Sequence, residues 1–359
     1  MRIAQVAPLY ESVPPKLYGG TERVVSWLTE ELVRMGHDVT LFASGDSETS
    51  ARLVPACEKA VWRDPDCRET LPQHVYLVEL VFSQAERFDV IHFHCDYVHF
   101  PFLRYHHVPN VTTLHGMLRT HDLETLFEAN PDVPLVSISN DQRRPFPAAN
   151  WQATIYHGMP RDLHTFRETA DDYLLFIGRV SPEKRLDRAI EIAVKSGRRL
   201  KVAAKTYDED RVYRAQVIDP LLDESKSLVE FLGEVGGREK DELIGNAAAL
   251  LFPIDWPEPF GLVMIEALAC GTPVIAWPHG SVPEIIEDGR TGYLVETIGE
   301  AVAAVDKLPR ISRAACRRAF EHRFDAAHMA RNYEDVYRKL AYGASGRTTT
   351  QVREGLVHG

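Results

Sequence analysis

The sequence contains the same succession of elements twice, about 170 residues apart, and this repetition restricts the fold more than any other feature. In each copy an apolar strand is followed by a glycine-bearing loop, a helix with a regular apolar face, a glycine and a second apolar strand. Such a βαβ unit predicts parallel strands joined by a right-handed crossover. The first copy comprises a strand at Ile3–Pro8, a loop at Leu9–Gly20, a helix at Thr21–Met35 and a strand at Asp38–Ala43.

The second copy begins with a strand at Tyr173–Ile177, which Gly178 interrupts. Ser181 and Pro182 suit the N-cap and first turn of the following helix, and Gly197 suits its end. Single cores stop growing beyond roughly 250–300 residues, so two such starts in 359 residues predict two domains. The expected fold is α/β, with two doubly wound Rossmann-like domains facing a central cleft.

The expected boundaries follow from charge and helical pattern. The N-terminal domain spans 1–165 and the C-terminal domain 170–324, with the charged segment 161–172 as linker. A closing helix at 326–340 is expected to pack back on the N-terminal domain, followed by a loose tail at 343–359. Further strands are predicted at 89–94, 111–114, 134–138, 153–156, 200–204, 229–232, 249–252 and 272–276.

Composition and charge exclude several functional classes. With 45% hydrophobic and 26% charged residues, the chain resembles an average globular protein. Its net charge of -11, with no surplus of cations in either half, disfavours nucleic acid and anionic membranes as partners. The five cysteines form no Cys-x-x-Cys pair, and no apolar stretch approaches the ~20 residues of a membrane span. With a start that turns polar too soon for a secretory signal, these features favour a cytoplasmic protein.

Ligands of doubly wound sheets bind at the carboxyl ends of the strands, so the loops there are the first candidates for a site. After the strand at 173–177, the segment Gly178 to Arg185 contains three cations, Arg179, Lys184 and Arg185, around a predicted helix start. Cations there oppose the helix dipole, and a bound phosphate would resolve the conflict. The alternative is a solvated charge run that Glu183 compensates.

A second candidate loop follows the strand at 249–252 and leads into a helix that opens at Phe260, Gly261 and Leu262. Gly261 would let a ligand approach the unpaired N–H groups of the first turn. Glu258 precedes this helix and Glu266 lies within it, about 12 Å apart at helical rise. That exceeds the ~5–9.5 Å of glycosidase acid/base pairs. The two carboxylates are therefore expected to bind different parts of one extended ligand, Glu266 needing a donor from ligand or protein.

These segments resemble the retaining, nucleotide-sugar-dependent glycosyltransferases with the GT-B fold, most closely glycosyltransferase family 4. The similarity extends from the Gly19–Glu22 loop to the segment 292–295 and the closing helix, and its most specific part is the E-x7-E element from Glu258 to Glu266. The resemblance implies that a hexose moves from a nucleotide diphosphate sugar, typically UDP-glucose or GDP-mannose, to a hydroxyl acceptor with an α-linked product. It implies no cofactor, since the nucleotide sugar is a co-substrate, and no metal.

The resemblance also implies roles for individual residues. Arg179 and Lys184 pair with the diphosphate, next to Gly178, and would stabilise the leaving group. Glu258 contacts donor-sugar hydroxyls, and Glu266 holds the ribose. The amides at Phe260, Gly261 and Leu262 face the sugar and phosphates. Gly20 lies near the reacting centre, and His115 beside the donor sugar. Two positions depart from the family pattern: His157 replaces the usual Asn of an Asn-Gly pair, and Arg185 replaces a frequent Gly.

Several alternatives remain open. His92, His94, Asp96, His106 and His107 could form a metal cluster, although hydrogen-bonded structural histidines are the more frequent case. An NAD dehydrogenase would need G-x-G-x-x-G after an opening strand, which the chain lacks. A nonhydrolysing sugar-nucleotide epimerase or a non-catalytic sugar-nucleotide-binding protein could use the same fold. The acidic N-terminal half favours a small hydroxylated acceptor over an anionic lipid surface, with no membrane association indicated.

Overall fold

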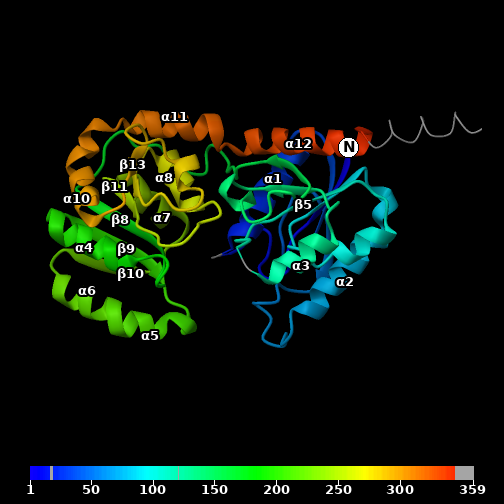
Figure 1. Ribbon diagram of the computed structural model, residues 1–359, viewed down its shortest axis with the longest axis horizontal. Helices are drawn as coiled ribbons and strands as arrows, with labels where there is room; N and C mark the ends of the chain where they lie inside the picture. Colours follow the sequence, from blue (N-terminus) through cyan, green and yellow to red (C-terminus); the bar gives the residue numbers. More distant parts are fainter. Residues whose placement is uncertain (17–18, 120, 344–359) are drawn as a thin grey trace, which may run out of the picture. The chain divides into compact units, whose positions relative to one another are not determined.

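The computed structural model describes residues 1–16, 19–119 and 121–343 and divides the chain into two compact units. The first unit contains Met1–Pro160 and the C-terminal helix, and the second is Arg161–Asp325. Each unit is an α/β structure around one parallel sheet (Figure 1). All of the tail predicted at 343–359 except Gly343 lies outside the described residues.

The first unit has a seven-stranded parallel sheet of order β3-β2-β1-β4-β5-β6-β7. Its order reverses between β1 and β4, as in doubly wound folds. Its strands are β1 (Arg2–Val6), β2 (Asp38–Ser44), β3 (Arg52–Cys57), β4 (Val90–Phe93), β5 (Asn110–Thr113), β6 (Leu135–Ser137) and β7 (Trp151–Thr154). Its helices are α1 (Gly20–Arg34), α2 (Leu71–Phe82), α3 (Asp122–Ala129) and α12 (Ala326–Gly343).

The second unit repeats this plan with six parallel strands in the order β10-β9-β8-β11-β12-β13. The reversal lies between β8 and β11. Its strands are β8 (Tyr173–Arg179), β9 (Arg199–Lys205), β10 (Val229–Gly233), β11 (Ala249–Phe252), β12 (Val274–Ala276) and β13 (Gly292–Leu294). Its helices are α4 (Leu186–Ser196), α5 (Arg211–Tyr213), α6 (Asp219–Ser225), α7 (Gly237–Asn246), α8 (Leu262–Cys270), α9 (Val282–Ile285), α10 (Ile298–Lys307) and α11 (Arg313–Arg323).

The predicted fold class, two doubly wound α/β domains, is confirmed. The central strands of both sheets lie in the hydrophobic core because they are apolar. Every residue of β4 and β11 is buried. Helices cover both faces, which excludes water from the backbone hydrogen bonds of the sheet. In the first unit, α12 packs against α1 (Figure 1). In the second unit, α11 packs on α8, and α10 packs on α4.

Several element boundaries differ from the predictions. The helix expected from Ser181 begins only at Leu186, because the preceding residues form a turn and Arg185 has a left-handed φ of 55°. The strand β3 was not predicted, since Ala56 is its one buried residue and Pro55 interrupts the pattern. The three-residue strand β13 was missed as a strand because it is short and contains a glycine. The closing helix continues past Leu340 to Gly343.

Candidate functional site

The carboxyl ends of β8 and β11 bring two predicted loops of the second unit together. The backbone N–H of Asp255 donates to the carbonyl oxygen of Glu183 at 2.8 Å, which joins the loop after β11 to the loop after β8. These two strands flank the point where the strand order reverses. Ligands of doubly wound sheets bind at that point, so the predicted donor residues of the second unit lie where the fold provides a site.

Lys184 and Glu258 form an ion pair at this edge. The Lys184 ammonium contacts the Glu258 carboxylate and lies 4.6 Å from the centre of the Trp256 ring. The indole N–H of Trp256 donates to the same carboxylate oxygen at 3.1 Å. The sequence predicted both charged residues at the site but not their pairing. Trp256 was missed, because an indole next to a cation leaves no spacing signal in the sequence.

Arg179 and Arg185 are also paired with carboxylates. The Arg179 guanidinium donates to Asp210 at 2.6 and 3.2 Å and lies 3.0 Å from Glu209. Arg185 donates to Asp187 and to Asp255 at 2.8 Å each. Glu183, the expected compensating residue, is 3.9 Å from Arg179. The cations therefore have protein partners, and a bound anion is not required to explain the charge pattern.

The N-terminus of α8 completes this edge of the second unit. Gly261 is the N-cap, with a left-handed φ of 80°, and a Cβ there would lie 2.8 Å from Met264 and 3.2 Å from the Glu258 side chain. A glycine is therefore required at this position. In the first helical turn that follows, the Met264 N–H donates to the Gly261 carbonyl oxygen at 3.1 Å. The N–H groups of Leu262 and Val263, which have no residue four positions back within the helix, can bind an acceptor. In contrast, Gly178 has no left-handed φ, and a Cβ there would find ordinary contacts.

Glu266, on the next turns of α8, is 6% exposed. Both of its oxygens lie near the Lys240 ammonium, at 2.8 and 2.7 Å. The donor that a buried carboxylate needs thus comes from the protein, from a lysine on α7. Sequence reasoning missed Lys240, because the contact joins two helices that meet only in the folded structure.

A second missed feature holds the backbone around Glu258. A Cβ at Gly280 would lie 2.3 Å from the Glu258 carbonyl oxygen, so only glycine fits against it. Ser281 follows, with its N–H donating to Glu258 O at 2.9 Å and its hydroxyl donating to Phe260 O at 2.8 Å. The segment from Gly280 to Ser281 therefore fixes the loop that carries Glu258.

In the first unit, Gly20 is the first residue of α1 and lies at the surface. Two residues later, Glu22 is 4% exposed, and burial raises the pKa of its carboxyl to about 7. The neighbouring carboxylates Glu11 and Asp96 act in the same direction. The Gly-Gly-Thr-Glu loop was selected for its glycines, and this buried carboxyl was not predicted.

His115 follows β5 and is half-buried, and burial lowers its pKa to about 3. Its Nε2 lies 2.9 Å from His94 Nδ1, and its ring stacks on His157 with ring centres 5.2 Å apart. His157, which replaces the usual Asn of the family pattern, is thus a direct neighbour of His115. Burial also lowers the pKa of His157, so both rings are neutral at physiological pH.

Two other histidines weighed as metal ligands, His92 and His106, make different contacts. His92 bonds to Tyr337 and Thr113 at 2.6 and 2.7 Å, and His106 stacks on Phe82. Among the described residues, the group whose geometry suits a metal is another one, His164, Asp241 and Cys270 in the second unit. There the Asp241 carboxylate is already hydrogen-bonded to His164 and to the Thr165 N–H, at 3.0 and 2.9 Å.

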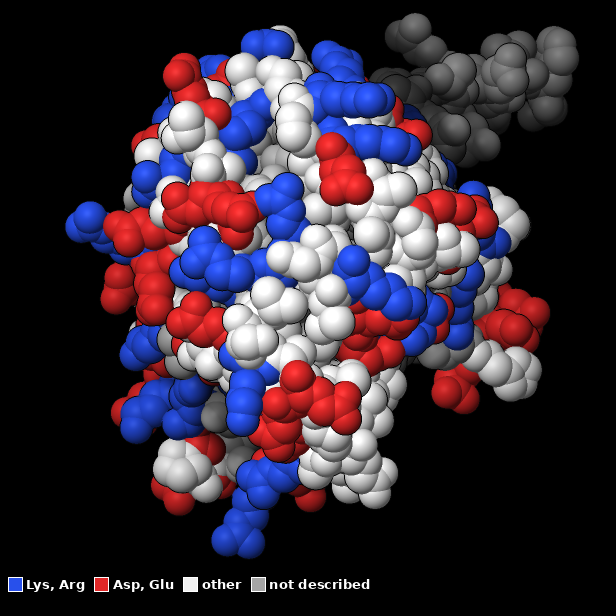
Figure 2. Space-filling model, turned by 90° about the vertical axis from the view of Figure 1, so that its left-hand side faces the viewer, with Lys and Arg blue, Asp and Glu red and all other residues white. Residues whose placement is uncertain are grey.

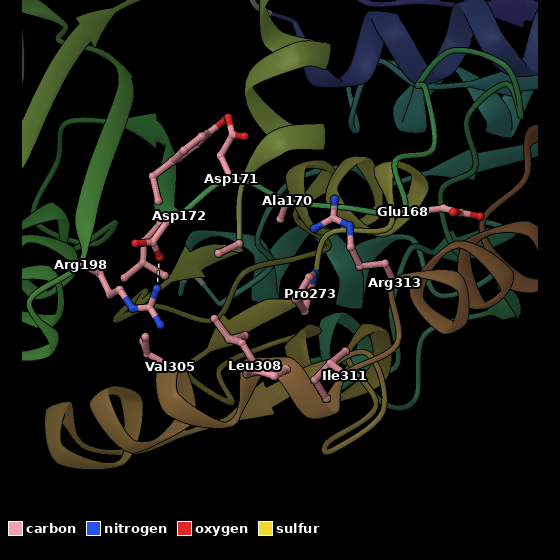
Figure 3. A pocket seen from close by; sticks show the side chains of 14 residues that line it. Glu168, Ala170, Asp171, Asp172, Arg198, Pro273, Val305, Leu308, Ile311 and Arg313 are labelled. Carbon is pink, nitrogen blue, oxygen red and sulfur yellow. Dashed lines mark hydrogen bonds and ion pairs between the residues drawn. The ribbon is translucent and has the colours of Figure 1, made fainter.

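A cavity of about 420 Å³ lies at the amino ends of the strands of the second sheet, opposite the candidate site. Residues that line it include Tyr173 and Pro273, at the amino ends of β8 and β12. Figure 3 shows Arg313 and the Arg198–Asp172 ion pair in its wall. The Arg313 guanidinium donates to backbone carbonyl oxygens, including those of Arg167 and Ala247, so it already has hydrogen-bond acceptors within the protein. None of the predicted site residues lines this cavity.

The surface charge and the length of the helices concern two classes of partner, polyanions and membranes. Figure 2 shows Lys and Arg interspersed with Asp and Glu over the face in view, without a broad field of positive charge. None of the helices within the described ranges has the length and apolar character that crossing a bilayer requires.

Comparisons with known proteins match both halves of the chain. Residues 18–156 match the family model "Glycosyltransferase Family 4", and residues 164–322 match "Glycosyl transferases group 1". The alpha-maltose-1-phosphate synthase of Mycolicibacterium smegmatis is 25% identical over 95% of this chain and all of its own length. The other curated relatives compared match over 25–52% of their own length, so the chain spans at most about half of these proteins.

Solved structures show the same architecture. AviGT4, a glycosyltransferase involved in avilamycin A biosynthesis, is 27% identical with a TM-score of 0.74, covering 95% of this chain and 98% of AviGT4. Anabaena HepE, solved in complex with UDP, is 17% identical with a TM-score of 0.73, covering 95% of this chain and all of HepE. With both halves matched, the chain belongs to the glycosyltransferases of the GT-B fold, with a family 4 N-terminal domain and a group 1 C-terminal domain.

Proposed function

We propose that this protein transfers a hexose from a nucleotide diphosphate sugar to a hydroxyl of a small acceptor, with retention of configuration and an α-linked product. The observation that carries the proposal is the Lys184–Glu258 pair beside the N-terminus of α8. A cation and the N–H groups at a helix N-terminus suit a pyrophosphate, and a carboxylate next to them suits sugar hydroxyls. One ligand that contains both groups is a nucleotide sugar.

The remaining donor contacts of the proposal are those that the family resemblance implies. Lys184, with Arg179, would stabilise the negative charge that develops on the departing diphosphate, together with the amides at Phe260, Gly261 and Leu262. Arg179 would share its guanidinium between Asp210 and a phosphate. Glu266 would bind the ribose while keeping Lys240, since a carboxylate accepts up to about four hydrogen bonds. Gly178 and Gly20 would allow close approach of the ligand, and His115 would lie beside the sugar.

These cations would stabilise the departing diphosphate without a metal ion. Lys184 and Arg179 carry the positive charge that a divalent cation supplies in other sites. We therefore expect activity to persist in EDTA. Retention would follow if the acceptor hydroxyl attacks from the face that the diphosphate leaves, with a phosphate oxygen taking its proton.

A thermal-shift panel of UDP, GDP and ADP sugars tests the donor site. HepE was solved with UDP, so UDP sugars come first. A ligand at 100 times its Kd should add about 2.7 kcal/mol to the free energy of unfolding. The shift should vanish in Arg179→Ala and Lys184→Ala and persist in Lys195→Ala, which removes an exposed lysine of α4 paired with Glu191. A full shift in both site variants would refute the proposed phosphate site.

The reaction itself is tested with candidate acceptors. The proposal predicts nucleotide release that depends on the acceptor, and a product whose anomeric configuration is α by NMR. Conversion of the nucleotide sugar without any acceptor would instead indicate an epimerase. Binding without turnover for every acceptor tried would favour a non-catalytic sugar-nucleotide-binding protein.

A further inference from the structure

A continuous chain of buried polar side chains crosses the first unit from His115 to α12. Each link is a hydrogen bond of 2.6 to 3.0 Å, and all members other than His115 are buried. The order of the chain is His115, His94, Gln5, Tyr337, His92, Thr113 and Tyr333.

The side-chain amide of Gln5 gives this chain a direction. Its Oε1 can only accept, so His94 Nε2 carries the proton at that contact of 2.9 Å. A neutral imidazole has one protonated nitrogen, so His94 Nδ1 is a lone pair that accepts from His115 Nε2–H. His115 Nδ1 is then also a lone pair. It is buried and has no hydrogen-bond partner among the described residues.

The histidines and Tyr337 of this chain are uncharged near neutral pH, so ionisation does not disturb its hydrogen bonds. Burial lowers the pKa of His115 to about 3 and the pKa of His92, His94 and His157 well below the usual value. The same burial raises the pKa of Tyr337. The titratable groups that face His115 are thus neutral near pH 7, and hydrogen bonds alone select the tautomers.

The opposite direction of the chain leaves a less favourable group in the interior. Turning the Gln5 amide over would reverse every link, and His115 Nδ1 would then be a buried N–H without an acceptor. Orphaned N–H groups are rarer in protein interiors than acceptors with an unused lone pair. The orientation with Oε1 toward His94 is therefore the more stable one.

We propose that Gln5 and His94 are positioning residues that hold His115 in the Nε2–H tautomer, so that its Nδ1 lone pair accepts a hydrogen bond from a ligand hydroxyl. The identity of that hydroxyl, on the donor hexose, rests on the proposed function, whereas the tautomer does not. A carbonyl or phosphate oxygen cannot donate and would not be bound by this nitrogen. The chain thereby selects a polyhydroxylated ligand over an anionic group at His115.

The tautomer can be measured directly in the full-length protein. In protein labelled with ¹⁵N-histidine, protonated and unprotonated ring nitrogens have well-separated chemical shifts, and loss of signals in His115→Gln assigns this residue. The expected result is a protonated Nε2 and an unprotonated Nδ1 between pH 5 and 8. A protonated Nδ1 on His115 would overturn the proposal.

A matched pair of variants tests the role of Gln5. Gln5→Met removes the oxygen that fixes His94, so the His115 Nδ1 signal should shift toward the protonated position. Thr113→Val removes one buried polar group farther along the same chain and should leave that signal unchanged. Equal changes in both variants would mean that Gln5 has no special role. Thermal melting of both variants establishes that they fold.

Ligand addition separates the tautomer from the proposed function. A nucleotide sugar that passes the thermal-shift test should move the Nδ1 signal of His115, whereas the matching nucleotide diphosphate, which lacks the hexose, should not. If no nucleotide sugar binds, the proposed function fails while the tautomer result stands. If the sugar binds and Nδ1 does not respond, the assigned hydroxyl contact is wrong.

Discussion

Arg179, Lys184 and Arg185 show how far single residues can be interpreted from sequence. Their positions near one strand end were predicted from spacing, and the structure brings Lys184 to Glu258 as part of that edge. The contacts of Asp210 with Arg179, of Trp256 with Lys184 and of Lys240 with Glu266 could not be predicted, because the two residues of each pair lie at least 26 positions apart in the chain. A sequence of this kind shows which charges gather near one strand end but not how they are balanced.

At the same scale, the buried Glu22 carboxyl predicts a pH dependence of stability. Its pKa is about 7 in the folded protein against 4.5 in the unfolded chain, so the folded state binds more protons between these values. The favourable contribution is complete below about pH 4.5 and is lost as the pH rises through 7. Glu22→Gln should therefore stabilise the protein at pH 8, by up to about 3 kcal/mol, and have little effect at pH 4.5.

Urea unfolding at the two pH values measures this difference. Glu58→Gln, which changes an exposed glutamate of the same unit, is the control and should have no pH-dependent effect of this kind. A stabilisation by Glu22→Gln that is equal at both pH values would contradict the raised pKa.

At the scale of elements, most strands and the helices α1, α8 and α12 were predicted within a few residues, because their apolar patterns are strong. The helix after β8 was the main error: Ser181 and Pro182 have the composition of a helix start, yet the chain forms a turn and α4 begins at Leu186. The competing preference is a turn, in which the Lys184 N–H donates to the Ser181 carbonyl oxygen at 3.1 Å. This delay places Lys184 in a loop, where its side chain reaches Glu258.

The C-terminal caps of two helices allow an element-scale prediction. Gly197 ends α4 and Gly271 ends α8, both with left-handed φ, of 65° and 82°. A Cβ at Gly197 would meet nothing within 4 Å, whereas a Cβ at Gly271 would lie 2.7 Å from the Phe166 ring. Gly197→Ala should cost about 1–2 kcal/mol of backbone strain. Gly271→Ala should cost about 1–3 kcal/mol more, since the Phe166 ring must also move.

The two alanine variants are compared by their urea midpoints, with circular dichroism as the signal. Each serves as the control for the other, because both replace a helix-capping glycine in the second unit. Equal destabilisation would show that the Phe166 ring yields without cost.

At the scale of the whole molecule, the first unit is discontinuous in sequence, because α12 follows the entire second unit. Its residues Tyr333 and Tyr337 are fully buried and hydrogen-bond to Thr113 on β5 and to His92 on β4. The amphipathic pattern of α12 was visible in the sequence. Its hydrogen-bonding partners were not, because they lie on strands more than two hundred residues away.

This discontinuity makes the first unit dependent on the end of the chain. The four large buried side chains of α12, Met329, Tyr333, Val336 and Tyr337, contribute on the order of 6–12 kcal/mol by burial. A domain's net stability is about 5–15 kcal/mol, so loss of α12 should unfold the unit.

A fragment of residues 1–160 should therefore lack cooperative urea unfolding, and a peptide of residues 326–343 added in trans should restore it. The fragment 161–325, whose core is continuous in sequence, should unfold cooperatively by itself. Circular dichroism follows all three transitions, and a peptide with Tyr333 and Tyr337 both replaced by Ser is the control. Cooperative unfolding of 1–160 without the peptide would show that the sheet and α1 to α3 suffice and that α12 is an accessory to this unit.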